Sequence, residues 1–242
     1  MKSANNKRIQ SDKIRRMVMV AMFTAMAYAV MLVIHIKVGF LTLDVKDAVI
    51  ALCGLYFGPL SALFVAVVVP VLELAVSSTG VYGLIMNILG SVTFSVTVSL
   101  FYKWKKTLLG AVAGLASAAL LTTAVMMLAN LFITPYYMGT TMEAVRGMIP
   151  TLLLPFNLLK SVINVGVVLL LYKPLSRVLH KLGIIGKKSV TEPEAQEGSK
   201  TPSSAKFSLT SLIVTLAAVV LIAASMVLIF TVLGGTFTFG NT

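Results

Sequence analysis

The chain is poor in charge and in the residues on which most metal sites and many enzymes depend. Only 12% of its 242 residues are charged, and it has two histidines and one cysteine. The lone Cys53, set in an apolar run, excludes an internal disulfide, and no Cys/His cluster or H-E-x-x-H pattern offers a zinc or haem site. A G-x-x-x-x-G-K-[ST] phosphate loop is also missing, which excludes ATP hydrolysis by that route. We therefore expect no enzyme activity, no metal and no cofactor.

Apolar sequence, in contrast, is abundant. Hydrophobic residues make up 58% of the chain, and the mean hydropathy is +0.97. A bilayer-spanning helix needs about 20 mostly apolar residues, and seven apolar runs approach that length. They lie near 17–34, 45–58, 59–78, 82–102, 107–134, 150–172 and 207–234. The second and third runs meet at Gly58-Pro59, which predicts a tight helical hairpin. The fold class is thus an all-α integral membrane protein in the lipid bilayer.

The basic residues indicate topology rather than binding to nucleic acid. The net charge is +12, but lysines and arginines lie between the apolar runs instead of forming one patch. Most of them precede the first run, follow the fourth or follow the sixth. These three places lie on one side of the membrane if the chain weaves through it, so the positive-inside rule places the N-terminus in the cytoplasm.

Composition divides the chain into four parts. Residues 1–16 form a basic cytoplasmic N-terminus, and residues 17–185 form a six-helix membrane body. Residues 186–206 are rich in Gly, Pro, Ser and mixed charge, which predicts a flexible cytoplasmic linker. Residues 207–234 form an appended transmembrane helix without a charged residue, which is expected to face lipid or a partner.

Two ionisable side chains lie inside predicted spans, where each costs about 2.5–3.5 kcal/mol on insertion scales. Glu73 and Lys160 both fall in the outer half of the bundle, where they could pair or face a common cavity. Asn157 lies three residues before Lys160 on the same helix face. The alternatives are snorkelling of the lysine to the headgroups and an interfacial position for the glutamate.

Amide and aromatic residues extend this pattern. Asn87 and Asn130 lie at span depth, and Tyr136 belongs to an aromatic segment at the outer interface. Hydrogen bonds between helices and an interfacial aromatic belt are the simpler explanations. Taken together, however, apolar walls with a few placed polar groups are typical of a small-molecule pocket. Its ligand would be a neutral or weakly polar organic molecule.

A stripe of small residues runs along one face of the first predicted span. Ala21, Ala25 and Ala29 recur every four residues, which lets another helix approach closely. Such a stripe serves either packing within the bundle or contact with a partner, and spacing alone favours packing.

Three sets of strings carry a resemblance to a known family. They are LPFNLLK at 154–160 followed by LYKPL at 171–175, LDVKD at 43–47 followed by GPL at 58–60, and YKWKK at 102–106. In this order they resemble the riboflavin-specific substrate-binding (S) components of energy-coupling factor (ECF) vitamin transporters. The resemblance covers about residues 11–185, and its most specific part is the PFNLLK string.

The resemblance implies a fold, a ligand and partners. Such S components are six-helix proteins of the bacterial plasma membrane that bind a vitamin from outside, and they associate with a transmembrane scaffold subunit and two cytoplasmic ATPases. Riboflavin would be the transported ligand rather than a cofactor. The family docks on its scaffold through an A-x-x-x-A stripe, which favours partner contact for Ala21 and Ala25. Asn157, Lys160 and Asn130 correspond to ligand-binding residues, and the loop from Gly39 to Leu43 would be a lid.

The third predicted span departs from the family. Riboflavin members often carry Lys-Asn and then His where this chain has Val69-Pro70 and Glu73. The ligand could therefore be a flavin variant, or another vitamin or precursor such as a pyrimidine or pterin. A third possibility is a membrane scaffold or anchor that binds no ligand.

Overall fold

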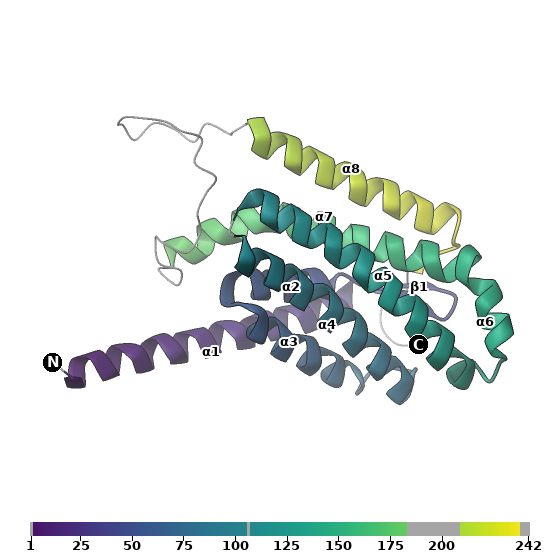
Figure 1. Cartoon of the computed structure of the whole chain (residues 1–242), viewed down its shortest axis with the longest axis horizontal. Coiled ribbons are helices and arrows are strands. Elements are labelled where there is room, and N and C mark those ends of the chain that lie inside the picture. Colours follow the sequence, from purple (N-terminus) through teal and green to yellow (C-terminus); the bar gives the residue numbers. More distant parts are fainter. Residues whose placement is uncertain (1, 106, 183–208, 238–242) are drawn as a thin grey trace.

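The computed structural model describes residues 2–105, 107–182 and 209–237, which form a helical bundle and a small sheet (Figure 1). The elements in chain order are α1 (Lys2–Val33), β1 (Ile36–Val38), β2 (Leu41–Leu43), α2 (Lys46–Phe57), α3 (Pro59–Glu73), α4 (Gly80–Trp104), α5 (Leu108–Met138), α6 (Met142–Met148), the π-helical turn η1 (Ile149–Leu153), α7 (Leu154–Lys181), α8 (Leu209–Thr231) and β3 (Thr236–Phe237). The predicted linker at 186–206 lies outside the described residues.

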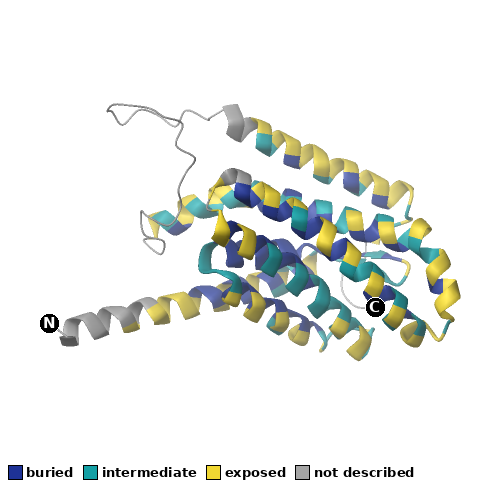
Figure 2. Ribbon diagram, viewed as in Figure 1, coloured by how far each residue is buried: buried dark blue, intermediate teal, exposed yellow. Residues whose placement is uncertain are grey.

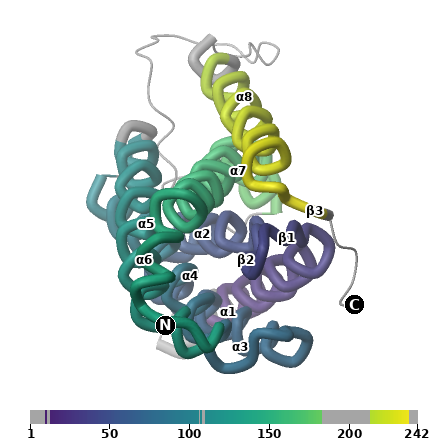
Figure 3. The backbone as a smooth tube through the Cα atoms, turned by 90° about the vertical axis from the view of Figure 1, so that its right-hand side faces the viewer, coloured from purple at the N-terminus to yellow at the C-terminus, as the bar shows by residue number. Residues whose placement is uncertain are grey.

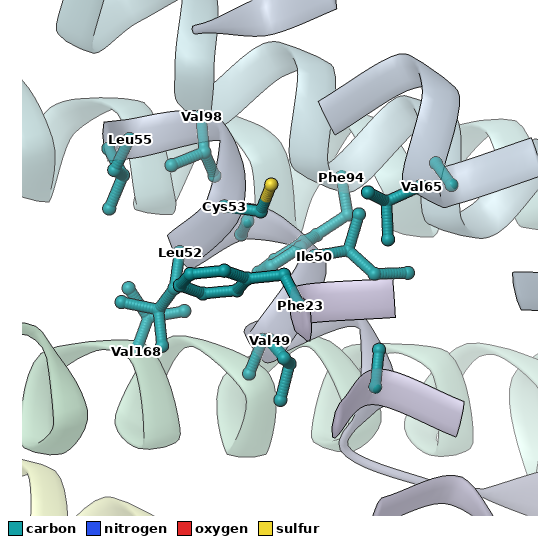
Figure 4. Close-up of a cluster of buried hydrophobic side chains, with 14 of the residues drawn as sticks. Phe23, Val49, Ile50, Leu52, Cys53, Leu55, Val65, Phe94, Val98 and Val168 are labelled. Carbon is teal, nitrogen blue, oxygen red and sulfur yellow. The ribbon is translucent and has the colours of Figure 1, made fainter. Parts of the chain in front are cut away.

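The short helix α2 forms the centre of the bundle. It contacts α1, α3, α4 and α7, and all of its residues from Lys46 to Leu55 are buried. Figure 4 shows its apolar side chains packed against Phe23 of α1, Phe94 of α4 and Val168 of α7. Cys53 lies in the same cluster with no exposed surface, so this lone thiol packs within the apolar core.

The corner between α2 and α3 follows directly from two residues. Gly58 has φ +89°, a backbone conformation that favours glycine, and its N–H donates to the carbonyl of Gly54. Pro59 then begins α3, where its missing N–H costs no helical hydrogen bond. The predicted helical hairpin is therefore confirmed.

The number of long spans is smaller than predicted. Among the described residues, five helical stretches, 13–33, 80–104, 110–138, 142–181 and 213–231, are long and apolar enough to cross a bilayer. The two predicted spans at 45–58 and 59–78 are instead short helices of 12 and 15 residues, because the break at Gly58 leaves neither long enough. The last helix of the body also begins earlier than residue 150, since α6 and η1 lead into α7.

The surface of the bundle is apolar. Large side chains such as Leu60, Leu120 and Val227 are exposed, and Figure 2 shows that exposed positions follow the outer faces of the helices. A soluble protein rarely exposes so much contiguous apolar surface. These faces fit contact with lipid, as expected for a multi-pass membrane protein.

The ends of the bundle differ in character. α1 runs without interruption from Lys2, so the basic N-terminal residues belong to the same helix as the first span rather than to a separate segment. Arg16 Nη2 donates to the carbonyl of Phe57 at 2.6 Å, and Arg15 Nη2 donates to the carbonyl of Leu182 at 3.3 Å. These bonds satisfy carbonyl groups at the C-terminal ends of α2 and α7, where a positive charge is favourable.

The opposite end carries a feature that an all-α prediction lacks. β1 and β2 form an antiparallel hairpin, and β3 adds to the free side of β1, giving the order β2-β1-β3. The helix α8 lies along α7 and brings β3 to this position (Figures 1 and 3). The appended helix is therefore packed against the body on one face.

Candidate functional site

A cavity of about 200 Å³ opens at the hairpin end of the bundle. The hairpin and helices α1, α2, α3, α4, α5 and α7 all contribute to its lining. Apolar and aromatic side chains form much of its wall, including Met31, Phe94, Met126, Ile133 and Phe156. Polar side chains from α2, α3, α4, α5 and α7 line the rest, so the cavity combines flat apolar contact with hydrogen-bonding groups.

Two charged residues that line the cavity, Glu73 and Lys160, belong to one chain of ion pairs. Lys46 Nζ lies 2.6 Å from Glu73 Oε2 and 3.3 Å from Asp44 Oδ2. Lys160 Nζ lies 3.0 Å from the same oxygen of Asp44. Glu73 and Lys160 thus face the common cavity, as one of the two expectations had it, but they do not pair with each other. Lys46 and Asp44 join them.

The first turn of α2 places these groups. Lys46 is fully buried, and its backbone N–H donates to Asp44 Oδ1 at 3.2 Å. Asn164 of α7 accepts the N–H of Ala48 at 2.8 Å through Oδ1, and its amide nitrogen donates to the carbonyl of Lys160. An asparagine from another helix thereby accepts from an N–H in the first turn of α2, which also donates to the carbonyl of Val45 at 3.2 Å. The start of α2 is tied to α7 and to Asp44.

Asp44 lies between β2 and α2, outside the helices. Burial disfavours its carboxylate, but the ammonium groups of Lys160 and Lys46 outweigh that effect and hold the pKa of Asp44 well below its usual value. Asp44 is therefore ionised at neutral pH and acts as the common acceptor for both lysines. If either lysine were removed, the other would still pair with Asp44.

The predicted amides also line the cavity. Asn157, Asn130 and Asn87 are all lining residues, together with Glu73 and Lys160. Asn157 donates from Nδ2 to the carbonyl of Leu153 at 2.8 Å, and Asn130 donates from Nδ2 to the carbonyl of Met126 at 2.7 Å. Each of these bonds reaches back four residues along the chain and fixes the orientation of the amide. The structure thus brings five of the six predicted ligand-binding residues together.

Tyr136 is the exception. Its side chain is 77% exposed and does not line the cavity, whereas its neighbour Tyr137 does. Successive residues of an α-helix point about 100° apart. The aromatic segment therefore reaches the cavity through the next residue along α5, and the placement expected for Tyr136 is wrong.

Several cavity residues were missed. Asp47 accepts a hydrogen bond from Ser91 Oγ at 2.5 Å, and both residues line the cavity. Thr122 of α5 lines it as well, and among the described residues its hydroxyl is the one buried side-chain N or O atom without a hydrogen-bond partner. The LDVKD string at 43–47 carried a signal for Asp47, since a cluster of charges directly before an apolar run is costly unless it is paired.

The hairpin forms part of the cavity wall. Gly39 has φ +59° and makes the turn between β1 and β2, while Lys37, Phe40 and Thr42 line the cavity. Lys160 Nζ donates to the carbonyl of Thr42 at 3.3 Å, so α7 holds the hairpin from the cavity side. The segment expected to act as a lid therefore lies at the cavity, although its opening and closing stay a prediction.

The small-residue stripe of α1 is exposed. Ala21, Ala25 and Ala29 all lie on the outer face of the helix, where no described part of the chain covers them. Packing within the described bundle therefore does not account for the stripe.

Among the described residues, no group of three or more His, Cys, Asp or Glu is placed to hold a metal ion.

A family model, a curated protein and a solved structure to which this chain is similar agree with one another. Residues 15–172 match the family model of the ECF transporter, substrate-specific component. The riboflavin transporter RibU of Staphylococcus aureus (strain TCH60) is 25% identical over 185 residues, which cover 73% of this chain and 98% of that protein. A solved structure of the S component of a bacterial ECF transporter matches with a TM-score of 0.60 and 28% identity, over 69% of this chain and 98% of that one.

Proposed function

Because the chain belongs to the family of ECF transporter substrate-specific components, we propose that it captures riboflavin or a closely related flavin from the extracellular side of a bacterial plasma membrane. The family is a transporter binding component and not an enzyme. Similarity to RibU over almost the whole of that protein supports a flavin ligand. At 25% identity, the choice of ligand has to be argued from the residues that line the cavity.

One observation carries the proposal: the cavity is lined both by apolar and aromatic side chains and by several buried polar groups. A flavin needs both, since its tricyclic ring is flat and largely apolar while its ring edge and ribityl chain carry donors and acceptors. Phe94 and Phe156 contribute to the apolar lining, and Asn157, Lys160 and Asn130 contribute to the polar lining. Pockets of this kind bind by apolar contact and are made specific by a few polar groups.

The remaining parts of the chain fit an imported cargo. The cavity lies at the end opposite Arg15 and Arg16, so a cytoplasmic N-terminus would turn the cavity mouth outward. The exposed stripe at Ala21, Ala25 and Ala29 would dock on an ECF transmembrane scaffold subunit. Two cytoplasmic ATPase subunits would supply the energy.

Titration of the purified full-length protein with riboflavin tests the proposal. We expect saturable quenching of flavin fluorescence at sub-micromolar ligand, which corresponds to a binding free energy better than about −8.2 kcal/mol. Asn157→Leu and Lys160→Met should each weaken binding at least about tenfold, or about 1.4 kcal/mol. Leu158→Ala, on the exposed face of the same helix, is the matched control.

The results separate the proposal from its rivals. Unchanged affinity in both cavity variants would refute the assignment of the site. No quenching at all would favour a second candidate, an S component for another vitamin or precursor, and the buried Lys46–Glu73 pair beside the cavity is the observation in its favour. Competition by pyrimidines and pterins would then identify the ligand class.

A further inference from the structure

The C-terminal helix and strand attach to the wall of the cavity. They lie beyond residue 172, where the match to the family model ends. β3 pairs with β1, so that Ile36 lies opposite Phe237 and Lys37 lies opposite Thr236. In Figure 3, α8 descends along α7 and ends beside the hairpin. A segment outside the matched body thus reaches the cavity wall.

The contact between α8 and α7 is close. Ala218, Ser225 and Ile229 are buried on one face of α8, while most other large side chains of this helix are exposed. A Cβ atom at Gly166 of α7 would lie 2.6 Å from Ile222 Cγ1 and 3.3 Å from the carbonyl oxygen of Ala218. Only glycine permits this approach without a shift, so α8 is seated at a defined position along α7.

The turn after α8 is equally constrained. Gly234 has φ +65°, and the N–H of Gly235 donates to the carbonyl of Ile229 at 3.0 Å. A Cβ atom at Gly235 would lie 2.8 Å from Ile229 Cγ2 and 3.4 Å from Ile36 Cγ2. These two glycines turn the chain from the end of α8 into β3 and against β1.

The pairing with β3 makes β1 a central strand instead of an edge strand. In the order β2-β1-β3, β1 is the central strand, and without β3 it would be an edge with unpaired backbone groups. Ile36 and Val38 of β1 are fully buried in one apolar cluster with Ile229 of α8 and Phe156 of α7. Lys160 holds β2 from the cavity side, and β3 holds β1 from the other side.

We propose that α8 and β3 form a strap that positions the β1–β2 hairpin as a wall of the cavity and thereby slows release of the bound ligand. The effect on ligand release rests on the proposed function, whereas the positioning of the hairpin does not. The strap is a positioning element, since none of its described residues lines the cavity. Affinity and residence time would depend on a segment that the six-helix body does not include.

Two substitutions in the full-length protein test the strap. Gly235→Val forces a side chain against Ile229 and Ile36, and Val232→Ala, at an exposed position of the same segment, is the matched control. We expect Gly235→Val to increase hydrogen–deuterium exchange across residues 36–43 and to raise the riboflavin dissociation rate at least about fivefold, with the control unchanged. Equal exchange and equal dissociation rates in both variants and the wild type would overturn the proposal.

A reversible cross-link keeps the test independent of any folding defect. Lys37→Cys and Thr236→Cys place two thiols on opposed strand positions, and the natural Cys53 is fully buried. We expect mild oxidation to form the disulfide and to slow both hairpin exchange and riboflavin release relative to the reduced form of the same protein. No disulfide, or identical exchange in the two forms, would overturn the strap.

If riboflavin does not bind the wild type, the proposed function fails, but cross-linking and exchange still decide whether the strap positions the hairpin.

Discussion

Loss of the Lys46 ammonium should destabilise the protein more than loss of the Glu73 charge. The ammonium group of Lys46 forms ion pairs with two carboxylates, Glu73 at 2.6 Å and Asp44 at 3.3 Å, whereas the carboxylate of Glu73 pairs with one ammonium group. Removing one partner of a buried ion pair costs about 3–5 kcal/mol, because the other charge stays buried without a partner. At about 2–4 °C per kcal/mol for a chain of this size, Lys46→Met should lower Tm by about 6–20 °C.

Glu73→Gln should have a smaller effect, since Lys46 keeps Asp44 as a partner. The double variant Lys46→Met/Glu73→Leu should recover part of the loss, because it removes both members of the pair. Lys173→Met, at an exposed position, is the matched control and should change the free energy of unfolding by no more than about 0.5 kcal/mol.

The chain provides its own probe for this measurement. Cys53 is fully buried in the core, so a thiol-reactive fluorophore reports unfolding as the protein is heated in detergent. The reasoning is refuted if Lys46→Met lowers Tm by no more than Glu73→Gln, or if the double variant loses the sum of both single losses. Either result would mean that the charges are not coupled as the distances indicate.

Three further results are expected. Thr122→Val should raise Tm in the same assay, because a buried hydroxyl without a partner costs about 1–3 kcal/mol; a lower Tm would mean that the hydroxyl is satisfied. Asp44 has a lowered pKa in the folded protein, so the stability it contributes is present above about pH 4 and is lost as the pH falls through that lowered value. The drop in Tm on acidification should thus be smaller in Asp44→Asn. Ala25→Trp should abolish co-purification with an ECF scaffold subunit while riboflavin binding stays unchanged, and retained co-purification would exclude the stripe as the docking face.

Local signals allowed much of the fold to be predicted. The corner at Gly58-Pro59 depends on two adjacent residues, and the long spans depend on continuous apolar runs. The polar cavity followed from Glu73, Lys160 and the amides, because polar groups at span depth need a purpose. The corner and the long spans are fixed by neighbours in sequence, whereas the cavity also requires the packing of several helices.

Contacts between distant residues could not be predicted in this way. Lys46 lies at the start of an apolar run, where a lysine side chain ordinarily reaches water. Its burial depends on an ion pair with Glu73, which is 27 residues away in the sequence. β1 and β3 are three and two residues long and separated by most of the chain, so neither has a pattern of its own. The exposure of Tyr136 depends on the rotation of α5 within the bundle.

The continuity of α1 has a mechanical consequence. At 1.5 Å per residue, its 32 residues make a rod about 48 Å long. Arg16, near the midpoint of this rod, binds the α2–α3 corner, the exposed alanines lie in its C-terminal half, and its end lies two residues before β1. Only two residues separate this helix from β1, so any tilt of the helix at the alanines would also move the cavity wall to which β1 contributes.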